Sequence, residues 1–233
     1  MNGFDASILD FIARHSSASH AINFAIGSLA GLYIAKGLLL VAALWWIWFS
    51  RDDRGAWRRE VVIATFASGL IALLLGRGLA YFLPFRLRPR FNTDLHFVMP
   101  AGAKADEVLR TWSSFPSDHA MIWMAVAMGI FIVWKRAGIA ALAYTVIVIC
   151  LPRVYLGLHY PTDIIAGALL GIIITYLLTR DGIRSAFTQP VLQLINRYPG
   201  PSGALAFVIC FELVSQFDEV RQIAQYLLKS HLH

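Results

Sequence analysis

Charged residues are scarce in this chain. Only 15% of its 233 residues are Asp, Glu, Lys or Arg, whereas 58% are hydrophobic. An average soluble domain is about 25% charged and about 45–50% apolar. The mean hydropathy of +0.62 points the same way. This composition argues against a water-soluble globule. The apolar residues gather in blocks of about 17–25, the length at which a helix crosses a bilayer.

Cysteine is also scarce, because only Cys150 and Cys210 are present and both lie in apolar runs. We expect no disulfide framework and no metal site, and we interpret both side chains as small buried hydrophobes. The start, "MNGFDASILDFIARHSS", carries acidic residues and lacks the basic region of a cleaved signal peptide. The sequence has no internal repeat, so we expect a single membrane domain over residues 1–233.

Long apolar blocks predict the transmembrane helices. Five blocks are clear, and they cover about residues 32–50, 61–83, 117–134, 138–152 and 163–179. A sixth block, 203–214, is too short for a firm assignment, and the role of residues 185–233 stays open. The expected fold class is therefore all-α, a polytopic membrane helix bundle with five to six transmembrane helices.

An amphipathic helix is predicted before the first crossing. Within residues 4–15, the apolar side chains of Phe4, Ile8, Phe11 and Ile12 share one helical face, and Asp5 falls on another. This pattern is typical of a helix that lies in the membrane interface. The small apolar residues 19–31 could extend the next span.

Basic residues indicate the orientation. The net charge of +6 comes largely from short segments beside the apolar blocks, so anionic lipid explains it better than nucleic acid does. Segments 51–60, 135–136 and 180–184 fall on one side, which the positive-inside rule makes cytoplasmic. We expect a multi-pass protein of the inner (plasma) membrane, with segments 84–116 and 153–162 facing the periplasm or exterior. No obligate protein partner is evident, and the oligomeric state is open.

Three polar clusters fall on that outer side: "FRLRPR" at 85–90, "PSDH" at 116–119 and "RVYLGLHYPTD" at 153–163. Arg88 and Arg153 offer planar guanidinium groups that grip phosphate oxygens in pairs. Ser117 starts a helix, where free backbone N–H groups favour an anion, and Asp118 follows in the same turn. The clusters therefore predict a phosphate site at the membrane surface.

Two histidines complete the pattern. His119 is placed in the first helical turn to give or take a proton, and His159 precedes Asp163 by four residues. A carboxylate beside an imidazole orients it as a base or nucleophile. Taken singly, these residues have ordinary explanations as an N-cap, lipid-headgroup contacts or interfacial hydrogen-bonding groups. Their joint occurrence favours catalysis on a phosphate.

With these clusters the chain resembles the type-2 phosphatidate phosphatase superfamily, which shares its fold with vanadium haloperoxidases. The family signatures are Lys-x6-Arg-Pro, Pro-Ser-Gly-His and Ser-Arg-x5-His-x3-Asp. The chain matches them, over roughly residues 61–180, with Arg88-Pro89, Pro116-Ser117-Asp118-His119 and Arg153-x5-His159-x3-Asp163. It departs from them at Tyr81 (for lysine), Pro152 (for serine) and Asp118 (for glycine), the last as in bacterial members that act on polyprenyl diphosphates.

The resemblance implies hydrolysis of a lipid phosphate without metal or cofactor. His159 would attack phosphorus, Asp163 would orient it, and His119 would protonate the leaving group. The implied phosphate ligands are Arg86, Arg88, Ser117, Asp118 and Arg153. Arg86 is favoured over Arg77 as the cation that replaces the family lysine.

Undecaprenyl diphosphate, cleaved to the monophosphate, is the expected substrate and lies within the bilayer. Phosphatidylglycerophosphate, phosphatidate and lipid A phosphate are alternatives within the same chemistry. Two other classes stay open, a non-catalytic lipid-phosphate binder or transporter and a vanadate-dependent peroxidase.

Overall fold

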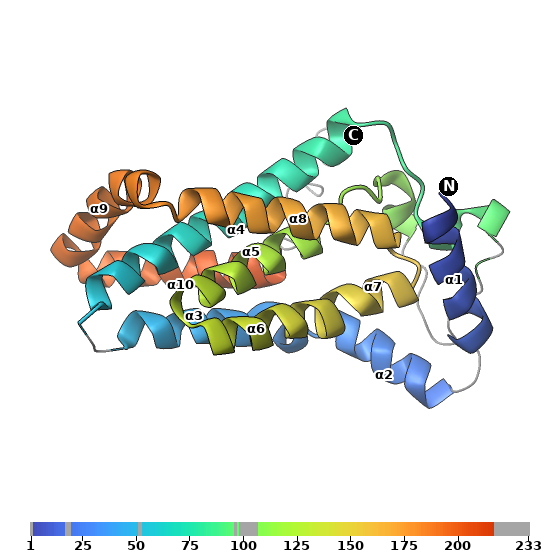
Figure 1. Ribbon diagram of the computed structural model, residues 1–233, viewed down its shortest axis with the longest axis horizontal. Helices are drawn as coiled ribbons and strands as arrows, with labels where there is room; N and C mark the ends of the chain where they lie inside the picture. Colours follow the sequence, from blue (N-terminus) through green and yellow to red (C-terminus); the bar gives the residue numbers. More distant parts are fainter. Residues whose placement is uncertain (1, 17–19, 51–52, 96, 98–106, 217–233) are drawn as a thin grey trace, which may run out of the picture.

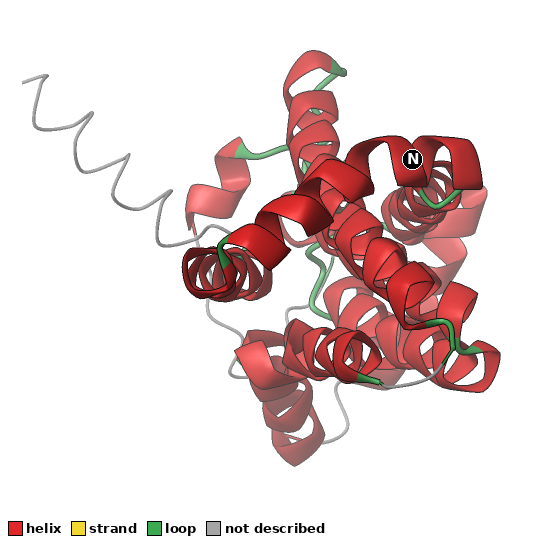
Figure 2. Cartoon of the chain, turned by 90° about the vertical axis from the view of Figure 1, so that its left-hand side faces the viewer, coloured by secondary structure: helices red, strands yellow, loops and turns green. Residues whose placement is uncertain are grey.

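The computed structural model describes residues 2–16, 20–50, 53–95, 97 and 107–216. Over these residues the chain forms helices and turns and no strands (Figure 2). The α-helices are α1 (Gly3–Ser16), α2 (His20–Gly31), α3 (Leu39–Phe49), α4 (Gly55–Phe82), α5 (Asp118–Val133), α6 (Lys135–Tyr144), α7 (Leu151–Tyr155), α8 (Pro161–Leu178), α9 (Asp181–Arg197) and α10 (Pro199–Ser215). Two π-helical segments, η1 (Ile34–Leu38) and η5 (Thr145–Cys150), join α2 to α3 and α6 to α7. The expected all-α fold is confirmed.

The helices reproduce the apolar blocks of the sequence. Three described segments are long and apolar enough to cross a membrane, namely Gly55–Phe82, Lys135–Tyr155 and Pro161–Leu178. The pair Ala21–Gly31 and Ile34–Phe49 would be a fourth, but it bends by 63°, so residues 19–31 do not simply extend the next span. Two shorter apolar helices, α5 and α10, correspond to the predicted blocks 117–134 and 203–214.

Helix α5 lies at the centre of the bundle (Figure 1) and packs against α3, α4, α6 and α8. It is apolar on all sides, as expected for a helix surrounded by others. Trp123 is its largest fully buried side chain. Helix α8 approaches α5 closely at Gly171, where a Cβ atom would lie 2.1 Å from the Met121 carbonyl oxygen. This close crossing holds the start of α8 beside the start of α5.

Helix α1 is amphipathic, but its faces differ from the sequence expectation. Phe4 and Phe11 are exposed, whereas Ile8 and Ile12 pack against the buried Leu9 cluster. Asp5 was expected to face away from the apolar side, and its side chain is instead fully buried. The expectation for Asp5 was wrong, because α1 packs against α7 and the start of α8 and brings this carboxylate into the protein.

The predicted polar clusters all lie at one end of the bundle. In Figure 1 the end of α4, the end of α7, the start of α8 and all of α1 lie at the right, and the starts of α4, α6 and α9 lie at the left. The described part of the first basic segment, 53–60, and the segments 135–136 and 180–184 belong to that left-hand end. Arg184 there pairs with the buried Glu60, at 3.0 Å between Nε and Oε2, and joins α9 to α4.

Candidate active site

Backbone hydrogen bonds join the three sequence clusters. The Ser114 N–H donates to the Arg86 carbonyl oxygen at 2.8 Å, and the Arg90 N–H donates to that of Gly157 at 3.0 Å. The Ser117 N–H donates to the Asp163 carbonyl oxygen at 3.2 Å. Segments that are far apart in the chain are thus held at fixed distances, and the convergence that topology predicts is present in the structure.

The loop between α7 and α8 carries His159 and turns sharply at Gly157. This glycine has a φ of +65°, which side-chain-bearing residues rarely adopt. A Cβ atom there would also lie 2.5 Å from the Phe97 ring. The sharp turn therefore requires glycine, and it places His159 beside Arg88.

The contacts of His159 define its tautomer. Nδ1 lies 2.8 Å from the Ser114 carbonyl oxygen, which can only accept a hydrogen bond. Nε2 lies 3.4 Å from Nη1 of Arg88, a guanidinium that can only donate. The neutral ring therefore carries its proton on Nδ1 and its lone pair on Nε2. That lone pair is the one a nucleophilic imidazole needs.

The charge state of His159 follows from its surroundings. Its side chain is buried, and burial lowers the pKa of the ring below the ordinary imidazole value. The Arg88 guanidinium lowers this pKa further, whereas Asp163 and Asp118 oppose the shift. The ring is therefore neutral at neutral pH and is available to attack.

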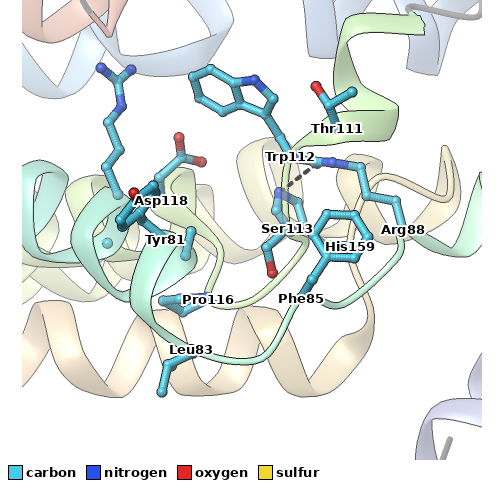
Figure 3. Close-up of a pocket in the computed structure, with 13 residues that line it drawn as sticks. Tyr81, Leu83, Phe85, Arg88, Thr111, Trp112, Ser113, Pro116, Asp118 and His159 are labelled. Atoms are coloured by element: carbon cyan, nitrogen blue, oxygen red, sulfur yellow. Dashed lines mark hydrogen bonds between the residues drawn. The ribbon is translucent and has the colours of Figure 1, made fainter.

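A cavity of about 380 Å³ opens beside this ring. Its lining includes His159 and Arg88 on one side and Asp118 and Tyr81 across from them (Figure 3). The remaining lining residues come from the end of α4 and from the segments 83–85 and 111–116; they are Gly76, Arg77, Ala80, Leu83, Phe85, Thr111, Trp112, Ser113 and Pro116. Cations and apolar groups thus line the same cavity, as a lipid phosphate requires.

Arg88 is the cation that the structure brings to the nucleophile. It is buried, and its Nη1 also donates to the Leu158 carbonyl oxygen at 2.9 Å. Arg77 lines the cavity from α4 and donates from Nη2 to the Gln216 carbonyl oxygen at 2.7 Å. Arg77 and Arg88 therefore both present positive charge to the cavity.

The start of α5 carries Ser117, Asp118 and His119. Ser117 is fully buried and caps the helix, with its Oγ 3.5 Å from the Ala120 N–H. One Asp118 carboxylate oxygen accepts from the His119 backbone N–H at 2.8 Å and lies 2.9 Å from Nδ1 of the His119 ring. Asp118 faces the cavity, whereas His119 is not among the cavity-lining residues. The carboxylate interacts electrostatically with both His119 and His159, so both rings lie near it.

Arg153 and Arg86 lie outside the cavity lining. Arg153 is buried, donates to the Ile149 carbonyl oxygen at 3.1 Å, and interacts electrostatically with Asp118 and His119. The Arg86 guanidinium is held between two carboxylates, with Nη1 2.5 Å from Oδ1 of Asp163 and Nη2 2.7 Å from Oδ2 of Asp5. The Arg86 guanidinium is therefore oriented by these two carboxylates, and its contact with a phosphate stays a prediction.

Asp163 lies near the nucleophile. Its Oδ2 is 3.8 Å from Nδ1 of His159 and accepts from the Tyr160 N–H at 2.8 Å. The hydrogen bond from His159 goes to Ser114, so the carboxylate acts on the ring as a nearby charge. Sequence reasoning missed Ser114, because a backbone acceptor has no side-chain signature. It also missed Asp5, whose position resembles that of any acidic residue on an amphipathic helix.

Among the described residues, no three His, Cys, Asp or Glu side chains are grouped as a metal site would need.

Comparison with known proteins gives a match to the PAP2 superfamily over residues 59–185. The chain belongs to the PAP2 superfamily. The resemblance that the motifs carry is thereby confirmed.

The relatives of this PAP2 protein include proteins of two Bacillus species. The Bacitracin transport permease protein BcrC of Bacillus licheniformis is 24% identical over 71% of this chain and 72% of its own length. The Undecaprenyl-diphosphatase BcrC of Bacillus subtilis is 26% identical over 80% of this chain and 85% of its own length. The crystal structure of a transmembrane PAP2 type phosphatidylglycerolphosphate phosphatase from Bacillus subtilis shares the fold, with a TM-score of 0.51 and 21% identity over 80% of this chain and 85% of that one.

The family, these relatives and the apolar helices together support a membrane lipid phosphatase.

Proposed function

We propose that this PAP2 protein hydrolyses undecaprenyl diphosphate to undecaprenyl phosphate, without a metal ion, through a phosphohistidine on His159. The observation that carries the proposal is the pairing of His159 with Arg88 on the cavity wall. Nε2 of His159, which carries the lone pair, lies 3.4 Å from Nη1 of the Arg88 guanidinium. A phosphate bound beside these two side chains has the His159 nucleophile and the charge-stabilising Arg88 guanidinium on the same side.

In the first step, Nε2 of His159 bonds to the terminal phosphorus, and the bond from phosphorus to the bridging oxygen breaks. Undecaprenyl phosphate leaves with that oxygen. The ring becomes a cation, which Asp163 stabilises from 3.8 Å while Nδ1–H still donates to Ser114. In the second step, water attacks phosphorus, the N–P bond breaks, and phosphate departs from a neutral ring.

His119 moves the protons in this scheme. Asp118 lies 2.9 Å from its Nδ1 and orients the ring. The negative charge of the bound diphosphate favours the protonated ring, which donates from Nε2 to the leaving oxygen. The neutral ring then accepts a proton from the attacking water. Positioned acid–base groups of this kind contribute about 10²–10⁴-fold to rate.

The phosphate ligands in this proposal are Arg88, Arg153, Ser117 and the first turn of α5 at Asp118. Arg88 contacts the terminal phosphate, and the buried charge of Arg153 acts electrostatically beside His119. We assign the second phosphate of the diphosphate to Arg77, because Arg77 lines the same cavity as Arg88. Arg86 serves the site indirectly, since two carboxylates already hold its guanidinium.

Exposed apolar residues mark the mouth of the cavity. Tyr81 is 83% exposed and Phe82 is 82% exposed at the end of α4, and Phe85 is exposed just beyond it. Tyr81 and Phe85 also line the cavity. Large exposed apolar side chains at a polar cavity suit a ligand with a charged head and a hydrocarbon tail. We therefore propose that the prenyl chain stays in the bilayer while its diphosphate enters here.

The proposed location is the inner (plasma) membrane, with the site on the periplasmic or external side. The basic starts of α4, α6 and α9 lie at the end of the bundle opposite the site (Figure 1). Short basic segments favour the cytoplasm. The site at the other end would then face outward.

The test measures phosphate release by the detergent-solubilised full chain, with EDTA present. Undecaprenyl diphosphate, phosphatidylglycerophosphate, phosphatidate and lipid A phosphate are assayed side by side. We expect the diphosphate to give the highest kcat/KM, and His159→Ala to abolish release. His15→Ala, which changes an exposed histidine of α1, is the matched control and should keep full activity.

Four outcomes would contradict parts of the proposal. Equal release by wild type and His159→Ala would show that His159 is not the nucleophile. Lipid binding without release by the wild type would favour a binder or transporter. Loss of activity with EDTA would refute the metal-free route, and a higher kcat/KM on another lipid would replace the substrate.

A further inference from the structure

Asp5 lies in α1, outside the stretch that matches the PAP2 superfamily. Its carboxylate is fully buried and makes three contacts at the site end of the bundle. Oδ2 lies 2.7 Å from Nη2 of Arg86 and accepts from the Thr162 hydroxyl at 2.7 Å. Oδ1 accepts from the Thr162 backbone N–H at 3.0 Å. Because all three contacts are to Arg86 and Thr162, we infer that this buried carboxylate fixes the positions of those two residues.

The first of these residues, Arg86, joins Asp5 to Asp163. Its other terminal nitrogen, Nη1, lies 2.5 Å from Oδ1 of Asp163 and 3.0 Å from Oγ1 of Thr162. The guanidinium also stacks over the Tyr160 ring, 3.9 Å from its centroid. Because the guanidinium is rigid and planar, fixing one end at Asp5 fixes the direction of the other.

Asp163 and Tyr160 in turn border the nucleophile. Asp163 accepts from the Tyr160 N–H through Oδ2 and lies 3.8 Å from Nδ1 of His159. Leu9 of α1 packs in the same buried cluster as Tyr160 and Val154. Helix α1 therefore holds both the carboxylate and the loop that determine where the His159 ring lies.

We propose that Asp5 is a positioning residue of this active site, acting on His159 through Arg86 and Asp163. Helix α1 is then part of the catalytic unit, although Asp5 precedes the first sequence motif, at 85–90, by 80 residues. The inference rests on the proposed function, since it assigns a role in the His159 reaction.

The charges around His159 predict a signature in the pH profile. Arg88 from the 83–88 segment, Asp118 from α5 and Asp163 from α8 act on this ring. Asp5, Arg86 and Asp163 form a cluster with two negative charges and one positive charge. Asp5→Asn removes one negative charge, so the protonated ring loses stabilisation and its pKa falls. The acid limb of kcat/KM should move to lower pH.

The experiment compares Asp5→Asn with Asp10→Asn in the full chain, using undecaprenyl diphosphate. Asp10 lies on the same helix, is exposed and pairs with Arg14. We expect Asp5→Asn to lower kcat about ten- to hundredfold, the loss typical of misplaced reacting groups, with KM little changed. We expect Asp10→Asn to match the wild type in kcat, KM and pH profile.

A double-mutant cycle tests the route of action. In an Arg86→Gln background, Asp5→Asn should add little further loss, because its path to Asp163 is already broken. Leu9→Ala loosens α1 without changing charge, so it should leave the acid limb in place. If Asp5→Asn does not fold, Thr162→Val replaces it. We expect Thr162→Val to lower kcat by a smaller factor than Asp5→Asn. In the Arg86→Gln background it should again add little further loss of kcat.

The outcomes separate this inference from the proposed function. If the wild type releases no phosphate from any lipid, the proposed function fails. If the wild type is active and Asp5→Asn keeps its kcat and pH profile, the positioning role of Asp5 is refuted. It is equally refuted if the losses of Asp5→Asn and Arg86→Gln multiply fully, or if Leu9→Ala shifts the acid limb by the same amount.

Discussion

Replacing Arg88 by glutamine should damage catalysis in two measurable ways. Arg88 is buried, lines the cavity and lies 3.4 Å from Nε2 of His159. A preorganised donor that faces developing charge contributes about 10²–10³-fold to kcat, which is about 2.7–4 kcal/mol. Arg88→Gln should therefore lower kcat by at least this factor, because it removes a full charge as well as a donor.

The second effect concerns pH. The Arg88 guanidinium lowers the pKa of His159, so its loss raises that pKa. Attack needs the neutral ring, and a higher pKa means that less of it is neutral at acidic pH. The acid limb of kcat/KM should thus move to higher pH in Arg88→Gln, the direction opposite to that expected for Asp5→Asn. Arg88→Lys keeps the charge but loses the fork, so it should lower kcat with a smaller shift of the limb.

The assay follows phosphate release from undecaprenyl diphosphate across the pH range in which histidine titrates. Arg110→Gln, which changes an exposed arginine of the 107–111 segment, is the control and should behave as wild type. If Arg88→Gln loses no more activity than this control, Arg88 does not contact the reacting phosphate. If its acid limb moves to lower pH, the electrostatic account of His159 is wrong.

Three further predictions address the substrate and the fold. His119→Gln should slow a lipid monophosphate more than the diphosphate, because an alkoxide needs a proton more than a leaving phosphate does; equal losses on the two would argue against His119 as the acid. Arg77→Gln should raise KM for undecaprenyl diphosphate and leave the Ki of undecaprenyl phosphate, the product, little changed; the reverse ranking would remove Arg77 from the second phosphate. Gly171→Ala should lower the Tm of the solubilised protein, since overpacking costs about 1–3 kcal/mol and the new Cβ would lie 2.1 Å from the Met121 carbonyl oxygen. Gly182→Ala, where nothing lies within 4 Å, is the matched control for that measurement and should not lower the Tm.

The spans and motifs could be predicted because they depend on local patterns. A run of apolar residues with no polar break can lie in lipid only as a helix, so the blocks 61–83 and 163–179 indicate α4 and α8 directly. Alternating spans then place 85–90, 116–119 and 153–163 at one end. Backbone hydrogen bonds from Ser114 to Arg86 and from Ser117 to Asp163 hold these segments together in the structure.

The protein partners of individual cations could not be predicted from such patterns. Arg86 and Arg88 are two residues apart in a loop, and the sequence favours Arg86 as the replacement for the family lysine. In the structure Arg88 meets His159, whereas Arg86 turns to Asp5 and Asp163. Which way each side chain points depends on partners elsewhere in the chain, and one of them, Asp5, lies 81 positions away.

The amino-acid sequence by itself determined that this protein is a bundle of apolar helices with a phosphate-handling motif set at one end, because hydropathy and helix geometry act locally. Only the tertiary structure decided that Ser114 sets the His159 tautomer and that the acidic group of α1 reaches the site. The physical reason is that a buried charge is stable only beside partners of matching geometry, and packing of distant segments chooses those partners. The contact between Asp5 and Thr162 spans 157 positions, a separation that no local pattern records.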